Sequence, residues 1–341
     1  MKQLTIIVPA YNAEAYLRNC LESMAGLDER LEILVIDDGS TDATSVIAQE
    51  FANRFPEEIH LISKPNGGHG SGINVGVQHA AGRYVKVVDA DDWIVSENLK
   101  PLLDALERAS ADAVITGYKT VNQKSGKVLS YSSECRYSGR EISLDQLLEV
   151  YEEITSCCSF HGLCYRTQMY RDSGLQLSEG IFYEDHEYAS LPFAYVDKVL
   201  ILPFYFYMYL IGNANQSVAF HNQVKRIGHI ETVTRSILAF RKANGPLTPV
   251  RDEYLLRKLT VVVVSYFAVA LVKNPDKRAG MRDAERYRVW LEDEEPELLR
   301  RIDKKYRTLL WFRRLHMPPA LYQGILDTNF YKKFRRIWMN S

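Results

Sequence analysis

Three aspartates that could bind a cation, Asp89, Asp91 and Asp92, directly follow an apolar run at residues 84–88. The run is rich in valine and too apolar to be exposed, which predicts a buried strand of a parallel sheet. Carboxylates this close together are costly unless a cation or hydroxyl donors satisfy them. Because α/β proteins bind ligands at the carboxyl ends of such strands, the pattern predicts a divalent metal and a nucleotide ribose. The alternative is an N-capping cluster for a helix starting near Ser96.

A second polar cluster, Asp37-Asp38-Gly39-Ser40-Thr41-Asp42, ends a predicted strand at residues 32–36. A carboxylate here can accept hydrogen bonds from a pyrimidine imide or a ribose, while Gly39 allows a tight turn. Asp42 suits the N-cap of the following helix. We therefore assign Asp42 to capping and Asp38 to ligand binding.

The segment at residues 64–72 is dense in glycine and precedes a predicted helix. Backbone N–H groups at such a place can approach a phosphate closely. The segment is not a GxxxxGK[ST] phosphate loop, and no GxGxxG fingerprint follows the first strand. Glycine-rich turns are common, so this segment adds to the other motifs without identifying a function alone.

Two later segments also carry candidate functional residues. Tyr183-Glu184-Asp185-His186-Glu187 is either a catalytic acidic segment or only the acidic first turn of a helix, which the helix dipole favours. Tyr205, Tyr207 and Tyr209 alternate as a strand requires, and they predict a core and cleft wall in preference to a sugar platform.

The first hundred residues alternate strand and helix, which predicts right-handed βαβ units and a mostly parallel sheet with helices on both faces. The polar strand ends should converge at one sheet edge, the usual place of a nucleotide cleft. A hairpin within 111–133 and a strand at 199–210 follow. The later pattern is helical, which predicts two domains, residues 1–217 and 218–341. The predicted strands are 4–8, 32–36, 59–63 and 84–88, and the predicted helices are 14–25, 42–54, 71–81, 222–243, 252–273, 281–292 and 297–312.

Composition limits the class of protein. At 341 residues with 46% hydrophobic content, the chain is long enough for a substantial core. The formal charge of −1 gives no reason to expect nucleic-acid binding. Five cysteines without zinc-type spacing predict reduced thiols of a cytoplasmic protein. Met1 leads almost directly into the first strand, which predicts no secretory signal peptide.

Two segments bear on membranes. The uncharged run at residues 260–272 is shorter than the roughly 20 residues of a spanning helix, so we predict a core helix. Residues 302–341 carry a net charge of +7, and 319–341 predict a basic amphipathic helix. Such a helix either contacts the inner face of the cell membrane peripherally or docks on the protein with a solvated basic face.

Together the motifs resemble the family 2 glycosyltransferases of the GT-A fold, of the nonprocessive bacterial type. The resemblance covers roughly residues 3–217, and a further family-like element ends at Asn215-Gln216-Ser217. The matching motifs are Ile7-Val8-Pro9-Ala10-Tyr11-Asn12, Val35-Ile36-Asp37-Asp38-Gly39-Ser40-Thr41-Asp42, the segment from Asn66-Gly67-Gly68 to Asn74 and Gly76, Asp89-Ala90-Asp91-Asp92, and Tyr183-Glu184-Asp185.

The resemblance implies a role for each matching position. Asp38 would read the uracil or its ribose, and Asp89 would hold the ribose hydroxyls. Asp91 would ligate Mn²⁺ or Mg²⁺ at the diphosphate, and Asp185 would be the catalytic base, with Glu184 beside it on the acceptor side. The remaining implied positions are Pro9, Tyr11 and Glu14 in the base pocket, Asn66, Gly67 and Ala90 in the donor site, and Trp93 near the acceptor.

The chain departs from the commoner family pattern in two places. Gly72-Ile73-Asn74 stands where many members have Ala-Arg-Asn, so an arginine for the diphosphate is absent, and His69 or Lys64 is a candidate substitute. The QxxRW signature of processive members is missing, which predicts transfer of one sugar per encounter.

The expected function is therefore inverting, metal-dependent transfer of one sugar from a nucleotide sugar, such as a UDP-sugar, to a hydroxyl. The acceptor would be a glycan, glycolipid or glycoprotein in cell-surface polysaccharide or glycoconjugate assembly, including a lipid-linked acceptor. The alternative is a noncatalytic nucleotide-sugar-binding subunit of a membrane glycan-assembly complex.

Overall fold

In the computed structural model the chain divides into two compact units, and residues 1–212 and 220–326 are described. The first unit comprises Met1–Asn213 and Pro246–Asp252, and the second takes up the rest of the chain. The predicted boundary at 217 and the element Asn215-Gln216-Ser217 lie outside the described residues, so the boundary stays a prediction.

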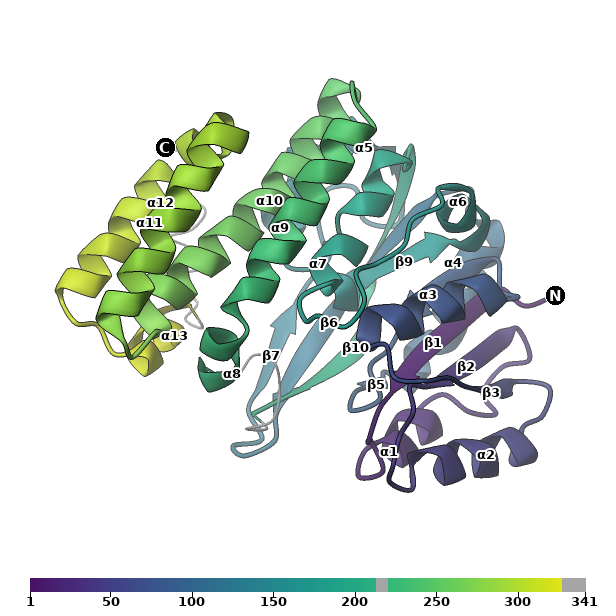
Figure 1. Ribbon diagram of the computed structural model, residues 1–341. Helices are drawn as coiled ribbons and strands as arrows, with labels where there is room; N and C mark the ends of the chain where they lie inside the picture. The colour runs from purple at the N-terminus through teal and green to yellow at the C-terminus, as the bar shows by residue number, and fades with distance from the viewer. Residues whose placement is uncertain (213–219, 327–341) are drawn as a thin grey trace. The chain divides into compact units, whose positions relative to one another are not determined.

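Within the described residues of the first unit, ten strands form one sheet in the order β3-β2-β1-β4-β9-β6-β10-β5, with β7 beside β6 and β8 beside β10 (Figure 1). β3, β2, β1 and β4 are mutually parallel, and β10 runs parallel to β6. β9 is antiparallel to both β4 and β6, so it joins two parallel groups of the same direction. The strands are β1 (Leu4–Ala10), β2 (Leu31–Asp37), β3 (Ile59–Ser63), β4 (Tyr84–Val87), β5 (Trp93–Ile94), β6 (Ala113–Asn122), β7 (Val128–Tyr131), β8 (Glu141–Ser143), β9 (Leu163–Arg166) and β10 (Lys198–Ile211).

Every residue of β1, β2 and β4 is buried, as expected for strands covered on both faces. α3 lies on one side of these strands, and α1 and α2 lie on the other (Figure 1). Glycines let α3 approach the sheet closely, because a Cβ at Gly76 would lie 2.5 Å from Ile7 Cγ2. The helices of this unit are α1 (Leu17–Glu22), α2 (Thr44–Arg54), α3 (His69–His79), α4 (Leu99–Arg108), α5 (Leu144–Ile154), α6 (Thr167–Asp172) and α7 (Asp185–Tyr188), with 3₁₀ turns at Ser96–Asn98, Phe160–Gly162 and Leu191–Ala194.

The predicted βαβ alternation is confirmed through β4, with helix ends that shift by a few residues. The predicted hairpin is confirmed as β6 and β7, and the strand at 199–210 is confirmed as β10. The sequence analysis did not predict β5, β8, β9, α5 or α6. β9 is only four residues long, and a run of that length carries too little periodicity to be recognised.

The described part of the second unit is helical, as predicted. One predicted helix, 222–243, is interrupted and forms both α8 and α9. Tyr266 stacks on Tyr287 with ring centroids 3.8 Å apart, and the Tyr287 hydroxyl donates a 2.7 Å hydrogen bond to Thr234 Oγ1. The helices are α8 (Phe220–Lys225), α9 (Ile227–Ala243), α10 (Pro249–Ala268), which continues as a π-helical turn at Val269–Lys273, α11 (Lys277–Glu294), α12 (Pro296–Arg314) and α13 (Pro319–Leu326).

The helix from Pro249 to Lys273 is long and apolar enough to cross a membrane by length and composition, with a mean hydropathy of 2.0 over its best 18-residue window. However, 72% of that window is buried within the protein. A buried core helix passes the same test, which agrees with the core helix predicted from the sequence.

Candidate active site

The carboxyl ends of three neighbouring strands bring the predicted donor-site residues to one sheet edge. Ala10 pairs with Asp37 at the ends of β1 and β2, and the Ala10 carbonyl accepts a 2.9 Å hydrogen bond from the Asp38 N–H. On the other side of β1, the Ile7 carbonyl accepts a 2.9 Å hydrogen bond from the Val88 N–H. The turns after β1, β2 and β4 therefore lie side by side.

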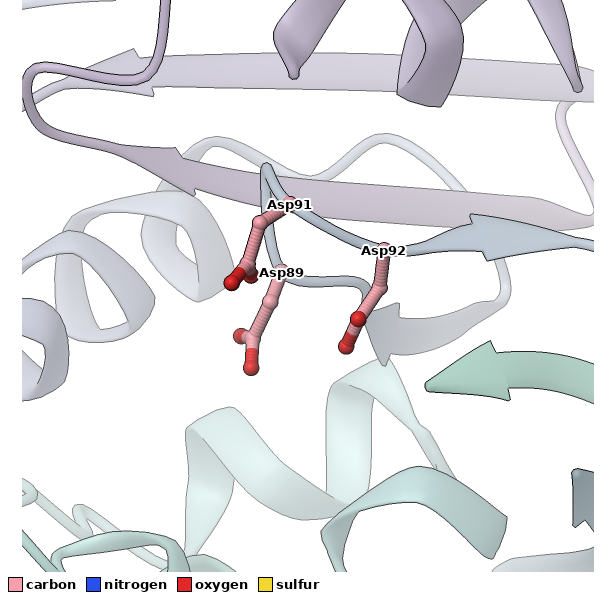
Figure 2. A group of neighbouring side chains, drawn as sticks. All are labelled: Asp89, Asp91 and Asp92. Carbon is pink, nitrogen blue, oxygen red and sulfur yellow. The ribbon is translucent and has the colours of Figure 1, made fainter. Parts of the chain in front are cut away.

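Asp89, Asp91 and Asp92 lie in the turn between β4 and β5. Each offers a carboxylate oxygen within 4.8 Å of the other two. Figure 2 shows the three side chains leaving the turn toward the same side. Carboxylate oxygens are the ligands that hard divalent cations such as Mg²⁺ and Mn²⁺ prefer, so the donor set fits such an ion.

Asp92 differs from its two neighbours because it is fully buried and already has two partners. Its Oδ2 accepts a 2.5 Å hydrogen bond from the Tyr207 hydroxyl, and its Oδ1 accepts a 2.7 Å hydrogen bond from the Leu210 N–H. Burial, together with the charges of Asp89 and Asp91, raises the pKa of Asp92 well above its ordinary value. Asp92 therefore holds β10 against the turn, and Asp89 and Asp91 are the more accessible carboxylates.

Asp89 shares a histidine with a residue far away in the sequence. His69, the first residue of α3, places Nε2 2.8 Å from Asp89 Oδ1 and Nδ1 2.6 Å from Glu184 Oε1. The His69 side chain is 31% exposed, that of Asp89 is 28% exposed, and that of Glu184 is 5% exposed. This chain of hydrogen bonds connects the end of β4 to the residue that precedes Asp185.

The two carboxylates keep His69 protonated. Burial lowers the pKa of His69, but the Asp89 charge and the hydrogen bonds to both carboxylates outweigh it and hold the pKa well above its ordinary value. Burial also raises the pKa of Asp89, and the charge and hydrogen bond of His69 reverse this shift and lower the pKa. The bridge is thus a charged imidazolium between two carboxylates, with both N–H groups in use.

Asp38 organises the glycine-rich loop. It is 3% exposed, and its Oδ1 accepts hydrogen bonds from Lys64 Nζ at 2.5 Å and from the Gly67 N–H at 2.9 Å. Its Oδ2 accepts a 2.8 Å hydrogen bond from the Gly68 N–H. The partners of Asp38 are protein groups, so its contact with a uracil or ribose stays a prediction, as does a phosphate contact of Gly67.

The suggestion that His69 or Lys64 replaces the missing diphosphate arginine is not supported by this arrangement. Both His69 nitrogens are hydrogen-bonded to carboxylates, and Lys64 Nζ is held by Asp38 and by the Pro65 carbonyl at 2.7 Å. The predicted N-cap role of Asp42 is wrong in position, because Ala43 is the N-cap residue of α2 and Asp42 precedes it. Asp42 Oδ1 accepts a 3.0 Å hydrogen bond from the N–H of Thr44, the first residue of α2.

The other predicted donor-site residues surround the same edge. Tyr11 is 53% exposed just after β1, whereas Pro9 and Ala90 are buried. Glu14 is exposed, and its Oε2 accepts a 2.9 Å hydrogen bond from the Ala43 N–H. Asn66 is exposed in the loop that Asp38 holds. The base pocket and its ligand contacts stay predictions.

Asp185 begins α7 and is partly exposed, immediately after the buried Glu184. Its charge acts on His161 and Tyr209, and the charge of Asp89 acts on the same two residues. The structure therefore brings Asp185 to the Asp89 side of the sheet edge. Trp93, predicted near the acceptor, is partly buried in β5.

A stack of aromatic rings lines this side of the sheet, and of its members only the tyrosines of β10 were predicted from the sequence. His161 lies between Tyr118 and Tyr209, with ring centroids 5.0 and 4.3 Å away, and meets Tyr207 edge to face. Burial lowers the pKa of His161 to about 4, so the ring is neutral at pH 7. The alternation of Tyr207 and Tyr209 in β10 was the only sequence signal for this wall, and its prediction as core and cleft wall agrees with these contacts.

Comparison with known proteins identifies the family. Residues 5–172 match the model of glycosyl transferase family 2. The glycosyltransferase GlyA of Streptococcus pneumoniae is 37% identical over 125 residues, which are 36% of this chain and 18% of GlyA. The poly(ribitol-phosphate) β-N-acetylglucosaminyltransferase TarS of Staphylococcus aureus is 34% identical over 125 residues, which are 36% of this chain and 22% of TarS. The matched part is thus about a fifth of the length of these relatives.

Solved structures share the fold. Residues 1–349 of S. aureus TarS superpose with a TM-score of 0.63 at 19% identity, covering 92% of this chain and 91% of that one. The complex of the same fragment with UDP-GlcNAc gives a TM-score of 0.54 at 18% identity, covering 92% of both chains. A mannosyltransferase from Pyrobaculum calidifontis, in complex with GDP-Man and Mn²⁺, gives 0.51 at 17% identity over 96% of this chain and 88% of that one.

The fold predicted from the sequence, a GT-A α/β domain followed by a helical region, is confirmed by these likenesses. The family-model match begins within β1 and ends within α6, and it includes the turns that carry Asp38, His69 and Asp91. Through residues 5–172, the chain is a member of glycosyl transferase family 2.

Proposed function

We propose that the protein is an inverting, metal-dependent glycosyltransferase that moves one sugar per encounter from a nucleotide sugar to an acceptor hydroxyl. The donor is a UDP-sugar in this proposal. The acceptor is a glycan, glycolipid or glycoprotein of cell-surface polysaccharide or glycoconjugate assembly.

The observation that carries the proposal is the meeting of two acidic segments that are almost a hundred residues apart in sequence. Asp89 and Asp91 end a parallel strand, where α/β proteins bind nucleotides. His69 connects this strand end to Glu184, and Asp185 follows directly. Inverting glycosyl transfer needs two kinds of group close together. One set of groups binds the donor, and a separate carboxylate acts on the acceptor hydroxyl.

Asp185 supplies the base in this mechanism. The pKa of a sugar hydroxyl is far above 7, so a carboxylate must take the proton as the oxygen attacks the anomeric carbon. Attack opposite the departing diphosphate inverts the anomeric centre. Asp89 keeps its Oδ2 for the ribose hydroxyls, because its Oδ1 is bound by His69. The aromatic wall of His161 and Tyr209 lies on the Asp185 side of the site.

Asp91 is the proposed metal ligand. Asp92 is less suited because Tyr207 and Leu210 already engage both of its oxygens. Mn²⁺ or Mg²⁺ bound there would neutralise the charge that develops on the diphosphate leaving group. A mannosyltransferase of similar fold was solved in complex with GDP-Man and Mn²⁺, which supports the proposal of a metal here.

The choice of UDP rests on TarS, which has been solved with UDP-GlcNAc. The mannosyltransferase holds GDP-Man instead, so the same fold accepts a different base. The nucleobase of the donor should therefore be identified first.

A cytoplasmic location, peripheral on the inner face of the cell membrane, completes the proposal. All five cysteines are free thiols, which agrees with a reducing compartment. The membrane contact was predicted for residues 319–341, of which 327–341 lie outside the described residues. α12 is rich in lysine and arginine, which would favour an anionic leaflet.

The proposal is tested by turnover with a panel of UDP-, GDP-, CDP- and dTDP-sugars, each with Mn²⁺ and with EDTA. We expect metal-dependent release of one nucleoside diphosphate. Asp185→Asn should lower turnover about 10²- to 10⁴-fold while donor binding is retained. The matched control is Asp172→Asn, an exposed aspartate at the end of α6. Nucleotide-sugar binding without turnover in the wild type, across acceptors including lipid-linked glycans, would favour a noncatalytic binding subunit instead.

A further inference from the structure

The glycine-rich turn at the start of α3 fits closely against residues 177–185, which we call the Asp185 loop. The Gly180 N–H donates a 2.7 Å hydrogen bond to the Gly67 carbonyl. A Cβ at Gly70 would lie 2.4 Å from the Ser178 carbonyl oxygen, and one at Gly68 would lie 3.0 Å from the Gly180 nitrogen. The glycines therefore make room for this loop, a role that the sequence analysis did not consider.

Asn74, one turn further along α3, holds the start of the same loop. Its Nδ2 donates a 3.0 Å hydrogen bond to the Leu177 carbonyl, and its Oδ1 accepts a 2.8 Å hydrogen bond from the Leu177 N–H. The start of the loop is thus fixed by the Asn74 side chain and by the backbone hydrogen bond between Gly180 and Gly67. The end of the loop, at Glu184 and Asp185, depends on side chains.

Glu184 depends on His69. The Glu184 residue is 4% exposed, and its Oε1 lies 2.6 Å from His69 Nδ1. Among the described residues, its buried Oε2 has no hydrogen-bond partner. A buried carboxylate without a donor is strongly disfavoured, so His69 is what allows Glu184 to stay in this position.

The backbone next to Glu184 needs such an anchor. Tyr183 has a φ of +75°, in the left-handed region that non-glycine residues rarely adopt. A residue in this region is held there by its surroundings. The His69–Glu184 hydrogen bond directly follows this turn, in the place where an anchor would hold it.

We propose that His69 is a positioning residue that fastens the Asp185 loop to the donor-site carboxylate Asp89. The hydrogen bonds from His69 to Glu184 and Asp89 hold the loop whether or not a reaction takes place. The role of His69 in positioning the catalytic base rests on the glycosyltransferase function proposed above. A donor that engages Asp89 acts on the same chain of hydrogen bonds that holds Glu184.

The first experiment measures hydrogen exchange of residues 178–188 in the ligand-free protein. His69→Gln removes one of the two hydrogen bonds and the positive charge, whereas the control His79→Gln changes an exposed histidine at the other end of α3. We expect exchange in the loop to rise about tenfold or more in His69→Gln, with β1 and β2 unchanged. Glu184→Gln, which keeps its shape, should give a smaller rise in the same residues. Loop exchange equal to that of His79→Gln in both variants would overturn the proposal.

The second experiment separates fastening from ligand binding. His69→Gln should lower kcat about 10- to 100-fold through misplacement of the base, with the dissociation constant for the nucleoside diphosphate changed less than about threefold. The double variant with Glu184→Gln should be no slower than His69→Gln alone, because both changes break one link. Fully multiplicative losses would contradict the proposal. If the wild type transfers no sugar, the proposed function fails, and the exchange experiment still decides whether His69 fastens the loop.

Discussion

Two neighbouring strands end in aspartates, and the structure uses these aspartates differently. At the end of β2, Asp37 and Asp38 are 4% and 3% exposed, and Asp38 is surrounded by a lysine and two backbone N–H groups. At the end of β4, Asp89 and Asp91 are partly exposed and face the same small volume. The first pair accepts hydrogen bonds from Lys64 Nζ and from backbone N–H groups, whereas Asp89 shares the imidazole of His69.

The comparison teaches that the surroundings of an acidic strand end decide its role more than its residue types do. Asp38 holds the glycine-rich loop through Lys64, Gly67 and Gly68, and its contact with a uracil or ribose stays a prediction. In our proposal, Asp89 binds the donor ribose and Asp91 binds a cation. The predictions below separate these roles.

The largest expected effect is on turnover at the β4 end. Asp91→Asn should lower turnover about 10³-fold, because the cation at the leaving diphosphate loses a charged ligand. The free energy of unfolding should change by less than about 0.5 kcal/mol, since Asp91 is partly exposed. Donor kinetics test the loss of turnover, and urea unfolding of the same preparation tests the change in unfolding free energy. Normal turnover in Asp91→Asn would show that the carboxylates at the end of β4 are not needed for catalysis, and the contrast with the end of β2 would fail.

The next effect is a pH dependence of protein stability that comes from His161. This residue lies near Asp89, at the end of β4. Burial lowers its pKa from 6.5 to about 4, so the unfolded chain takes up a proton in this window and the folded protein does not. Stability should therefore fall as the pH drops from about 6.5 toward 4. At about 1.36 kcal/mol per pKa unit, the loss is at most about 3 kcal/mol.

His161→Phe keeps an aromatic ring in the stack and removes this titration. The difference in unfolding free energy between wild type and variant, measured from pH 7 to pH 4.5, isolates His161 from other titrating groups. Two parallel pH curves would contradict the assignment of a neutral, buried imidazole.

A smaller effect is expected at the β2 end, and there it concerns stability. Asp38→Asn removes the charge that Lys64 Nζ and two N–H groups share, and it turns an amide NH₂ toward one of these donors. The expected cost is about 2 kcal/mol of unfolding free energy. Because the loop lies opposite Glu184, a moderate loss of turnover should accompany it. Stability equal to that of the wild type would show that Asp38 does not hold the loop.

Much of this comparison could be predicted from the sequence. The buried strand before Asp89 follows from one tyrosine and three valines within residues 84–88, and the alternation of strand and helix predicts that the acidic ends meet at one edge. What could not be predicted is which carboxylates the protein itself satisfies. The partners of Asp38 lie in a turn that is 26 to 30 residues away in sequence. The conformation of a turn leaves no periodic pattern in the sequence, so these contacts could not be predicted.

The role of His69 was even less accessible. Its partner Glu184 is 115 residues away, and the contact depends on glycines that admit the loop. From the sequence, His69 was one of two guesses for a diphosphate contact. β9, which places Phe160 and His161 beside the site, is too short to be predicted, so the part of these two residues in the aromatic wall was also out of reach.

The most direct measurement is the thermal unfolding of the wild type, Asp91→Ala and Asp38→Asn with UDP, GDP, CDP or dTDP, in Mn²⁺ or in EDTA. We predict that one diphosphate stabilises the wild type only with metal and that Asp91→Ala loses this stabilisation. Asp38→Asn should unfold at a lower temperature yet still respond to the same nucleotide. Absence of any nucleotide shift in well-folded wild-type protein, or a shift that survives in Asp91→Ala, would contradict a metal-assisted donor site at the end of β4.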